Sequence, residues 1–312
     1  MINNVNESNS RTIVSVGMAT RDTYFEMDSL PVEEGKLCAR SLGNFCGGMA
    51  ANVAINLHIL GHHVILVHCL GDDPNGKFIK KTLRSHLPDN QIVSSKSSRS
   101  FATLVFIEAQ TSKRLAILTD GEFSRSLTSP QLSALKQADF IYADGSWPID
   151  GKLLRVRSNK TDLNIMVNLE FPHIHLSKWF EWADIGVHSS SYLGLTEDCT
   201  QREIESALRT SCQSQSKLVG VTQGAKGGFF ISENTVLEVN AIQVDTIDTN
   251  GAGDAFQTGL IHGLMNGWKH EHCLKFAATI AAFQCTVLGP NLGGMTQEQV
   301  MIGMEKINGN WN

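Results

Sequence analysis

The stretch "CGGMAANVAINLHILGHHVILVHCLG", residues 46–71, holds a helix pattern followed directly by a strand pattern. Within residues 46–63 apolar side chains recur at helical spacing until Gly61, at Ala51, Ala54, Ile55, Leu57 and Leu60. Residues 64–71 are then mostly apolar and end in a glycine, which is typical of a strand buried on both faces of a parallel sheet. We therefore expect a helix followed by a central strand.

The same alternation of strand and helix patterns continues along the chain. Strands are predicted at 12–17, 138–145, 163–170, 183–190 and 217–231, and helices at 75–87, 200–213, 253–267 and 270–289, with one more helix between 145 and 163. Such alternation needs crossover connections, so we expect an α/β fold with a mainly parallel central sheet and helices on both faces. One domain is expected over residues 11–306, after a disordered polar tail at 1–10.

Two β-rich stretches, residues 22–45 and 99–120, interrupt this alternation. The second is predicted to form a hairpin around residues 111–113. We expect both stretches to leave the core as a small lid. Exposed strand edges in a lid need cover, and the lid of a second copy is one way to supply it.

Composition narrows the classes of function. The 312 residues are 42% hydrophobic and 18% charged, which is enough for a sizeable core. A formal net charge of −5 offers no electrostatic footprint for nucleic acid or an anionic membrane. No apolar run approaches the roughly 20 residues of a membrane helix, and the polar N-terminus does not resemble a signal peptide. A cytoplasmic protein without nucleic-acid or membrane partners is expected.

The cysteines and histidines do not form ligand patterns. The seven cysteines contain no CxxC pair, and their odd number argues against a disulfide framework; they stand at 38, 46, 69, 199, 212, 273 and 285. Paired histidines are adjacent or two residues apart, so on a helix they would not share a face. We expect reduced thiols and no histidine metal site.

A second glycine-rich stretch, "DTNGAGDAFQTG" at residues 248–259, precedes an apolar helix pattern. Glycine is routine in such turns, so a purely structural interpretation is open. In the other interpretation, the backbone amides of Gly251, Ala252 and Gly253 bind an anion at the helix N-terminus. Asp254 would then be a general base beside that anion, rather than only a favourable charge in the first helical turn.

Two signatures resemble those of the PfkB, or ribokinase-like, family of carbohydrate kinases. "DTNGAGDAFQTG" resembles the family's C-terminal signature DTxGAGD. "GGMAANVAINLHILG" at 47–61, with "LGDDPNG" at 70–76, resembles its N-terminal signature. The resemblance covers residues 12–305 and is specific because both signatures occur in order within a matching strand–helix rhythm. Features such as "FIYADGSW" and "VNLEFP" are most similar to the ketohexokinase-like branch.

The resemblance implies catalytic and sugar-binding roles. Asp254 matches the aspartate that deprotonates the sugar hydroxyl, and the amides of residues 251–253 match the anion hole for the developing phosphoryl charge. Family positions that bind sugar fall on Asp22, Gly48 and Asn52. From the residues alone, Asp22 reads equally well as a turn-capping aspartate. The buried Asn52 amide needs partners, which a sugar hydroxyl or a backbone carbonyl would provide.

The resemblance also implies a nucleotide site. The loop "VTQGAKGG" at 221–228 resembles the family loop along the ATP phosphates and ribose, which assigns Thr222, Gly224 and Gly227. Asn168 matches an asparagine that contacts nucleotide phosphates in several members, although it also reads as a strand-end turn residue. The adenine is expected near residues 282–285.

Metal ions enter as implications of the same resemblance. Mg²⁺ is expected because ATP phosphates carry it, but no direct protein ligand is assigned. His188 and Ser191 stand where many members have an NxxE motif with its carboxylate. Asp248 and Asn250 match positions that hold a monovalent cation such as K⁺ in some members.

These implications favour an ATP-dependent kinase that phosphorylates a hydroxyl, expected to be primary, of a small ketose or furanose. Met49 follows Gly48 where kinases of ribose and of phosphorylated fructose carry lysine, which argues against a phosphorylated sugar. A nucleoside kinase is the alternative, with a base clamp from lid aromatics; the candidates are Phe25, Phe45, Phe101 and Phe106. A non-catalytic sugar-binding relative is the other alternative. Relatives dimerise through the lid, so a homodimer is expected.

Overall fold

The computed structural model of the chain describes residues 11–31, 36–124, 126–147, 163–169, 183–196, 198–211 and 216–308. The tail predicted at 1–10 and the helix predicted between 145 and 163 fall largely or wholly outside these residues. The other predicted elements can be compared with the structure.

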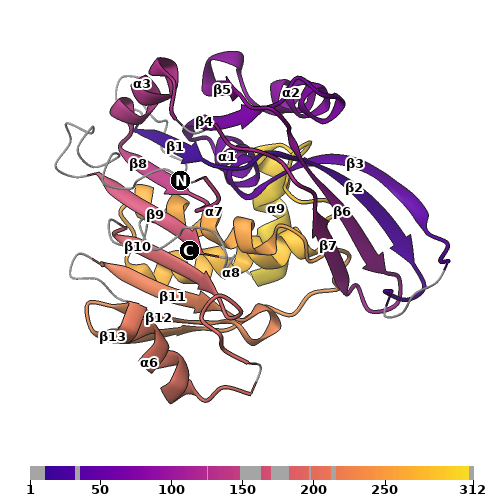
Figure 1. The fold of residues 1–312 in the computed structure, drawn as a ribbon. Coiled ribbons are helices and arrows are strands. Elements are labelled where there is room, and N and C mark those ends of the chain that lie inside the picture. The colour runs from indigo at the N-terminus through magenta and orange to yellow at the C-terminus, as the bar shows by residue number, and fades with distance from the viewer. Residues whose placement is uncertain are drawn as a thin grey trace.

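A nine-stranded sheet forms the centre of the molecule, in the spatial order β13-β12-β11-β10-β9-β8-β1-β4-β5 (Figure 1). Every pair from β5 to β11 is parallel, and β12 and β13 join antiparallel. The strands are β1 (Thr12–Val16), β4 (His63–Leu70), β5 (Ile92–Lys96), β8 (Phe140–Ala143), β9 (Asn164–Leu169), β10 (Ile185–Ser189), β11 (Leu218–Thr222), β12 (Gly228–Ser232) and β13 (Thr235–Val239). The predicted α/β fold with a mainly parallel sheet is confirmed.

Helices cover both faces of this sheet, and β4 shows why its sequence is apolar throughout. Val64 and Leu66 join the core cluster under one group of helices, which comprises α1 (Met49–Ile59), α7 (Ala252–Met265) and α8 (His270–Cys285). Ile65 and Val67 join the opposite cluster, under α3 (Ser129–Gln137) and α6 (Gln201–Ser211). Alternate residues therefore enter two separate cores, and a strand buried on both faces has no polar side.

The remaining helices complete the periphery. Helix α9 (Gln297–Asn308) packs on α8, and α2 (Pro74–His86) contacts the strands β2 and β3. Two short 3₁₀ turns, η2 (Asp89–Gln91) and η3 (Gly224–Lys226), precede β5 and β12. Within the described part of the chain, no helix combines the length and apolar character needed to cross a membrane.

The start of α1 differs from the prediction. The pattern placed a helix over 46–63, but Cys46 and Gly47 still belong to β3 (Arg40–Gly47), and the helix begins at Met49. Gly48 between them has φ of 94°, which a side chain would rarely adopt. Glycine can end a strand or begin a helix, so the apolar pattern alone could not locate this boundary.

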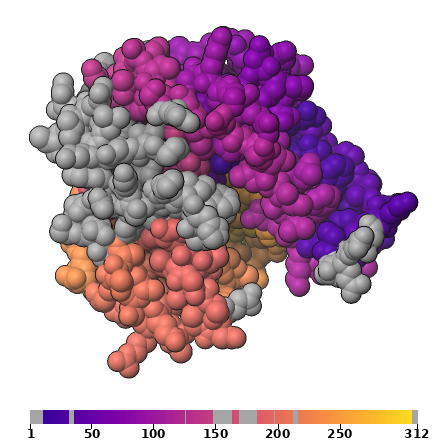
Figure 2. Space-filling model, in the orientation of Figure 1, coloured from indigo at the N-terminus to yellow at the C-terminus, as the bar shows by residue number. Residues whose placement is uncertain are grey.

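The two stretches predicted as a lid form one separate four-stranded sheet, in the order β3-β2-β6-β7. Its other strands are β2 (Thr20–Met27), β6 (Phe101–Glu108) and β7 (Arg114–Leu118). Strand β2 pairs antiparallel with β3 and parallel with β6, and the predicted hairpin joins β6 to β7. This lid sheet extends from one side of the body (Figures 1 and 2).

Gly259 of α7 lies where the α8 backbone comes closest, because a β-carbon there would stand 2.6 Å from the Cα of Ala277. Gly259→Ala must push the two helices apart, so we expect urea titration to show a free energy of unfolding lower by about 1–3 kcal/mol. Gly253 of the same helix has no described atom within 4 Å of such a β-carbon. Gly253→Ala should keep the free energy of unfolding or raise it by up to about 1 kcal/mol. Equal losses in the two variants would contradict this account.

Candidate active site

Helices α1 and α7 both begin near the carboxyl edge of the central sheet, each after a glycine with positive φ. Gly251 precedes α7 with φ of 75°, and a β-carbon on it would stand 1.9 Å from the carbonyl oxygen of Pro290. Gly48 precedes α1, and its β-carbon would stand 2.5 Å from the carbonyl oxygen of Met18. Both positions therefore require glycine, because another stretch of backbone occupies the space of a side chain.

Asp254 and Asn52 meet between these two helix starts. The Asn52 amide nitrogen donates to Asp254 Oδ2 at 2.7 Å, and both side chains are buried. The Asn52 carbonyl oxygen accepts from the amide nitrogen of Asn291 at 2.8 Å. The sequence left a sugar hydroxyl or a backbone carbonyl as partners of the Asn52 amide. The structure shows two side-chain partners, Asp254 and Asn291, and the contact with a sugar stays a prediction.

Asp22 lies on β2, on the lid face that is turned toward the body. Its carboxylate accepts from the Thr20 hydroxyl, and a β-carbon on Gly47 would stand 1.9 Å from one of its oxygens. Burial raises the pKa of Asp22 to about 6, against the opposing effects of hydrogen bonds from Thr20 and Thr103 and of the Arg114 charge. This carboxylate is therefore shielded from water, in a position where its oxygens can accept hydrogen bonds.

Asp248 and Asn250 shape the loop before α7. The Asp248 carboxylate accepts from the backbone N–H groups of Asn250 at 2.8 Å and Gly289 at 3.0 Å. The Asn250 amide bonds to the Tyr24 hydroxyl and to the Arg114 guanidinium, which both come from the lid. Burial raises the pKa of Asp248. The loop is thereby tied to the lid, while the cation predicted at these two residues stays a prediction.

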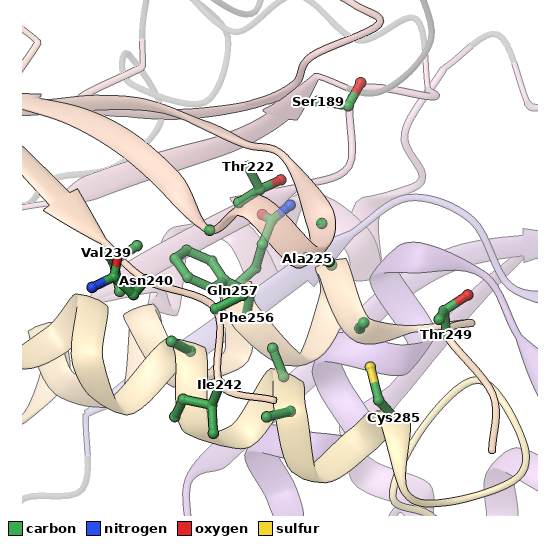
Figure 3. A pocket seen from close by; sticks show the side chains of 18 of the residues that line it. Ser189, Thr222, Ala225, Val239, Asn240, Ile242, Thr249, Phe256, Gln257 and Cys285 are labelled. Carbon is green, nitrogen blue, oxygen red and sulfur yellow. The ribbon is translucent and has the colours of Figure 1, made fainter. Parts of the chain in front are cut away.

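A cavity of about 550 Å³ opens beside this loop. Four residues predicted to bind nucleotide line it, namely Asn168, Thr222, Gly224 and Gly227. Ala252 and Gly253 of the predicted anion hole line it as well, and so do Ala282 and Cys285 of α8, where the adenine is expected. Figure 3 shows Thr222, Gln257 and Cys285 among the residues that line this cavity. Asp22, Gly48 and Asn52 are not among its lining residues, and neither are Gly251 and Asp254.

The cavity wall near β9 and β10 carries neutral groups. Burial lowers the pKa of His188 to about 4, so its ring is uncharged at neutral pH and stacks on Tyr192 with ring centroids 5.3 Å apart. The Asn168 amide donates to the Met49 sulfur at 3.4 Å. Within the described residues, no group of three or more His, Cys, Asp or Glu side chains could hold a metal ion.

Several residues at this site escaped the sequence analysis. Arg114 and Gln257 line the cavity, and Asn291 contacts Asn52. Asp144 is buried and accepts from the backbone N–H groups of Met18 and Ala50, so it joins the end of β1 to the start of α1. Only Asp144 carried a usable signal, since it directly follows the buried strand β8 in "FIYADG".

Curated proteins similar to this chain act on different sugars. An ATP-dependent 6-phosphofructokinase of Thermoanaerobacterium thermosaccharolyticum is 26% identical over 263 residues, which is 78% of this chain and 80% of the relative. The acarbose 7(IV)-phosphotransferase of an Actinoplanes species is 23% identical over 305 residues, or 93% of this chain and 97% of the relative.

Solved structures share the fold described above. Ribokinase of Giardia lamblia superposes with a TM-score of 0.81 at 17% identity, over 95% of this chain and 100% of that one. Arabidopsis thaliana ribokinase, solved with ribose and ATP, superposes with a TM-score of 0.76 at 22% identity, over 95% and 99% of the two chains. A sequence model of one family, described as pfkB family carbohydrate kinase, matches residues 10–297. This match takes in both signature stretches and nearly all of the described fold, and the chain accordingly belongs to the pfkB family of carbohydrate kinases.

Proposed function

We propose that this protein is an ATP-dependent kinase that phosphorylates a hydroxyl, most simply a primary one, of a small neutral ketose or furanose. The observation that carries the proposal is the position of Asp254. Its carboxylate is fixed in the first turn of α7, and the two preceding residues line a cavity whose wall also carries the predicted nucleotide-binding residues. The proposed base thus directly follows two residues of the cavity wall at the N-terminus of α7.

In the proposed reaction, the substrate oxygen attacks the γ-phosphorus of ATP while the bond to the β-phosphate oxygen breaks and ADP leaves. Asp254 takes the proton of the attacking hydroxyl. The amides of residues 251–253 stabilise the charge that develops on the transferred group, helped by the positive end of the α7 dipole. The left-handed Gly251 turns these amides into position.

Mg²⁺ fits this site as an ion carried by the ATP phosphates, where it would neutralise their charge. The described cavity wall offers neutral amides for its water shell, on Asn168 and Gln257. The Gln257 amide oxygen is buried and accepts no hydrogen bond from the described residues. His188, uncharged at neutral pH, would not repel the ion.

The sugar would lie between the lid and the start of α1, where Asp22 accepts hydrogen bonds from its hydroxyls and where Gly48, the other predicted sugar-binding position, precedes the helix. The apolar Met49 beside this region favours a sugar without a phosphate group. Two of the aromatic residues considered for a nucleoside clamp are engaged elsewhere. Phe25 and Phe106 stack on each other at 5.5 Å, and alternation along β2 puts Phe25 on the lid face opposite to Asp22. This removes two of the four clamp candidates and favours a sugar over a nucleoside.

Asp254→Asn tests the base directly. The amide keeps the shape but cannot take a proton, so we expect kcat to fall by about 10²–10⁴-fold in an ADP-release assay with a panel of ketoses, aldoses and nucleosides. Asp245→Asn is the control, because it removes an exposed carboxylate nine residues before Asp254. Retention of kcat by Asp254→Asn would refute the proposed function.

Asp22 gives a prediction of pH dependence. Its pKa rises from 3.8 to about 6 on folding, so the native state binds the extra proton and stability falls as pH rises through this window. The loss above pH 6 amounts to at most about 3 kcal/mol. We expect Asp22→Asn to bind sugar more weakly and to lose less free energy of unfolding than the parent between pH 4.5 and 7.5. If the free energy of unfolding depended on pH in the same way in both proteins, burial of the charged Asp22 carboxylate would not carry the cost assigned to it.

We also propose a homodimer that forms through the lid. The outer lid face carries the stacked Phe25–Phe106 pair, and Ile117 on the neighbouring strand is 46% exposed. A second copy packed against the lid would cover both the exposed apolar side chains and the unpaired edges of the lid strands. Light scattering is expected to give a dimer mass, and Phe106→Glu with Ile117→Glu is expected to give a monomer. A monomeric parent protein at working concentration would overturn this proposal.

A further inference from the structure

Asn291 lies in the segment between α8 and α9, and two backbone groups determine which way its amide points. Its side-chain oxygen accepts from the N–H of Gly293 at 3.0 Å, and its nitrogen donates to the carbonyl oxygen of Cys46 at 2.8 Å. A backbone N–H can only donate and a carbonyl can only accept. The amide of Asn291 therefore has one orientation that satisfies both contacts.

This orientation passes to the next amide. The nitrogen of Asn291 also donates to the side-chain oxygen of Asn52 at 2.8 Å, and the nitrogen of Asn52 donates to Asp254 Oδ2 at 2.7 Å. An amide has a donor end and an acceptor end, so fixing one end fixes the other. With its oxygen on Asn291, Asn52 must present its N–H₂ group to Asp254.

All three side chains are shielded from water, with exposed fractions of 9% for Asn291, 4% for Asn52 and 7% for Asp254. Reversing either amide would set oxygen against oxygen at one end and N–H against N–H at the other, and little water is available to compensate. The segment that carries Asn291 is itself anchored, because the N–H of Leu292 donates to the side-chain oxygen of Asn56 at 2.9 Å. The two amides thus act as a rigid chain from backbone to carboxylate.

We propose that Asn291 is a positioning residue that acts through Asn52 to keep a hydrogen-bond donor on the carboxylate of Asp254. The proposal rests on the proposed role of Asp254 as the base. A donor at this place holds the carboxylate in one rotamer and favours its ionised form, which is the form that accepts a proton. Asn52 would then serve the chemical step, in addition to any contact with sugar.

Asn291→Asp is the informative substitution. It preserves shape and the acceptor for Gly293, but it cannot donate to Asn52. The Asn52 amide then turns its nitrogen to residue 291 and its oxygen to Asp254. We expect kcat to fall by about 10- to 100-fold while KM for the sugar changes by less than about 3-fold. Thermal unfolding verifies that the variant is folded. If it is not, Asn291→Ala, which leaves Asn52 unoriented, should give a smaller loss of kcat in the same direction.

We call the path from Asn291 through Asn52 to Asp254 the relay. A double-mutant cycle separates an effect through the relay from general loosening of the segment that carries Asn291. In an Asn52→Leu background Asn291 has no route to Asp254, so Asn291→Asp should lower kcat by no more than about 2-fold further. Asn56→Ala is the matched control, because it frees the Leu292 N–H of the same segment without touching the relay. Its effect should be the same with Asn52 or Leu at position 52.

The outcomes distinguish the two proposals. If the fold-losses in kcat caused by Asn291→Asp and Asn52→Leu simply multiply in the double variant, the relay is overturned. An unchanged kcat of Asn291→Asp would overturn it as well. Either result together with an inactive Asp254→Asn protein leaves the proposed function standing. An active Asp254→Asn protein removes the base and the relay with it.

Discussion

The hydrogen bond between Asn52 and Asp254 joins residues 202 positions apart, and the arrangement of the site depends on it. It connects the first turns of α1 and α7, so the two helix N-termini converge on one point. Two positive dipole ends at one place favour negative charge there, whether from a carboxylate or from a bound anion. The glycines with positive φ before both helices make this convergence sterically feasible.

Several carboxylates are buried around the same edge of the central sheet, and this carries a cost. Burial raises the pKa of Asp22, Asp144 and Asp248, which means that their charged forms are disfavoured relative to water. Asp144 and Asp248 recover part of this cost through backbone N–H donors. Asp22 has the Thr20 hydroxyl and the lid charge of Arg114 instead. Asp22, the one of the three expected to meet a ligand, is thus compensated by side chains and not by backbone donors.

The sequence was sufficient for the fold and for one side of the site. The apolar run of β4 reflects burial on both faces, and the glycines at 251 and 253 reflect the turn into a helix. Each of these requirements concerns a short stretch of chain and is therefore visible as a pattern in that stretch. Asn291 and Arg114 left none, because their partners are 239 and 136 positions away, at Asn52 and Asn250. Strand β7 was predictable only as part of a hairpin, since four of its five residues are exposed. Contacts between residues this far apart in the sequence can be recognised only from the three-dimensional structure.

The loop from Asp248 to Asp254 is the place where these distant parts come together. Through Asn250 it contacts Tyr24 and Arg114 of the lid, and through Asp248 it holds the segment after α8. Its last residues line the cavity and bond to α1. A displacement of the lid therefore cannot leave this loop unaffected unless the two lid contacts break. These seven residues thus connect the lid to Asp254. Their side chains are polar or small because each must form a hydrogen bond in a different direction or leave room for another backbone segment.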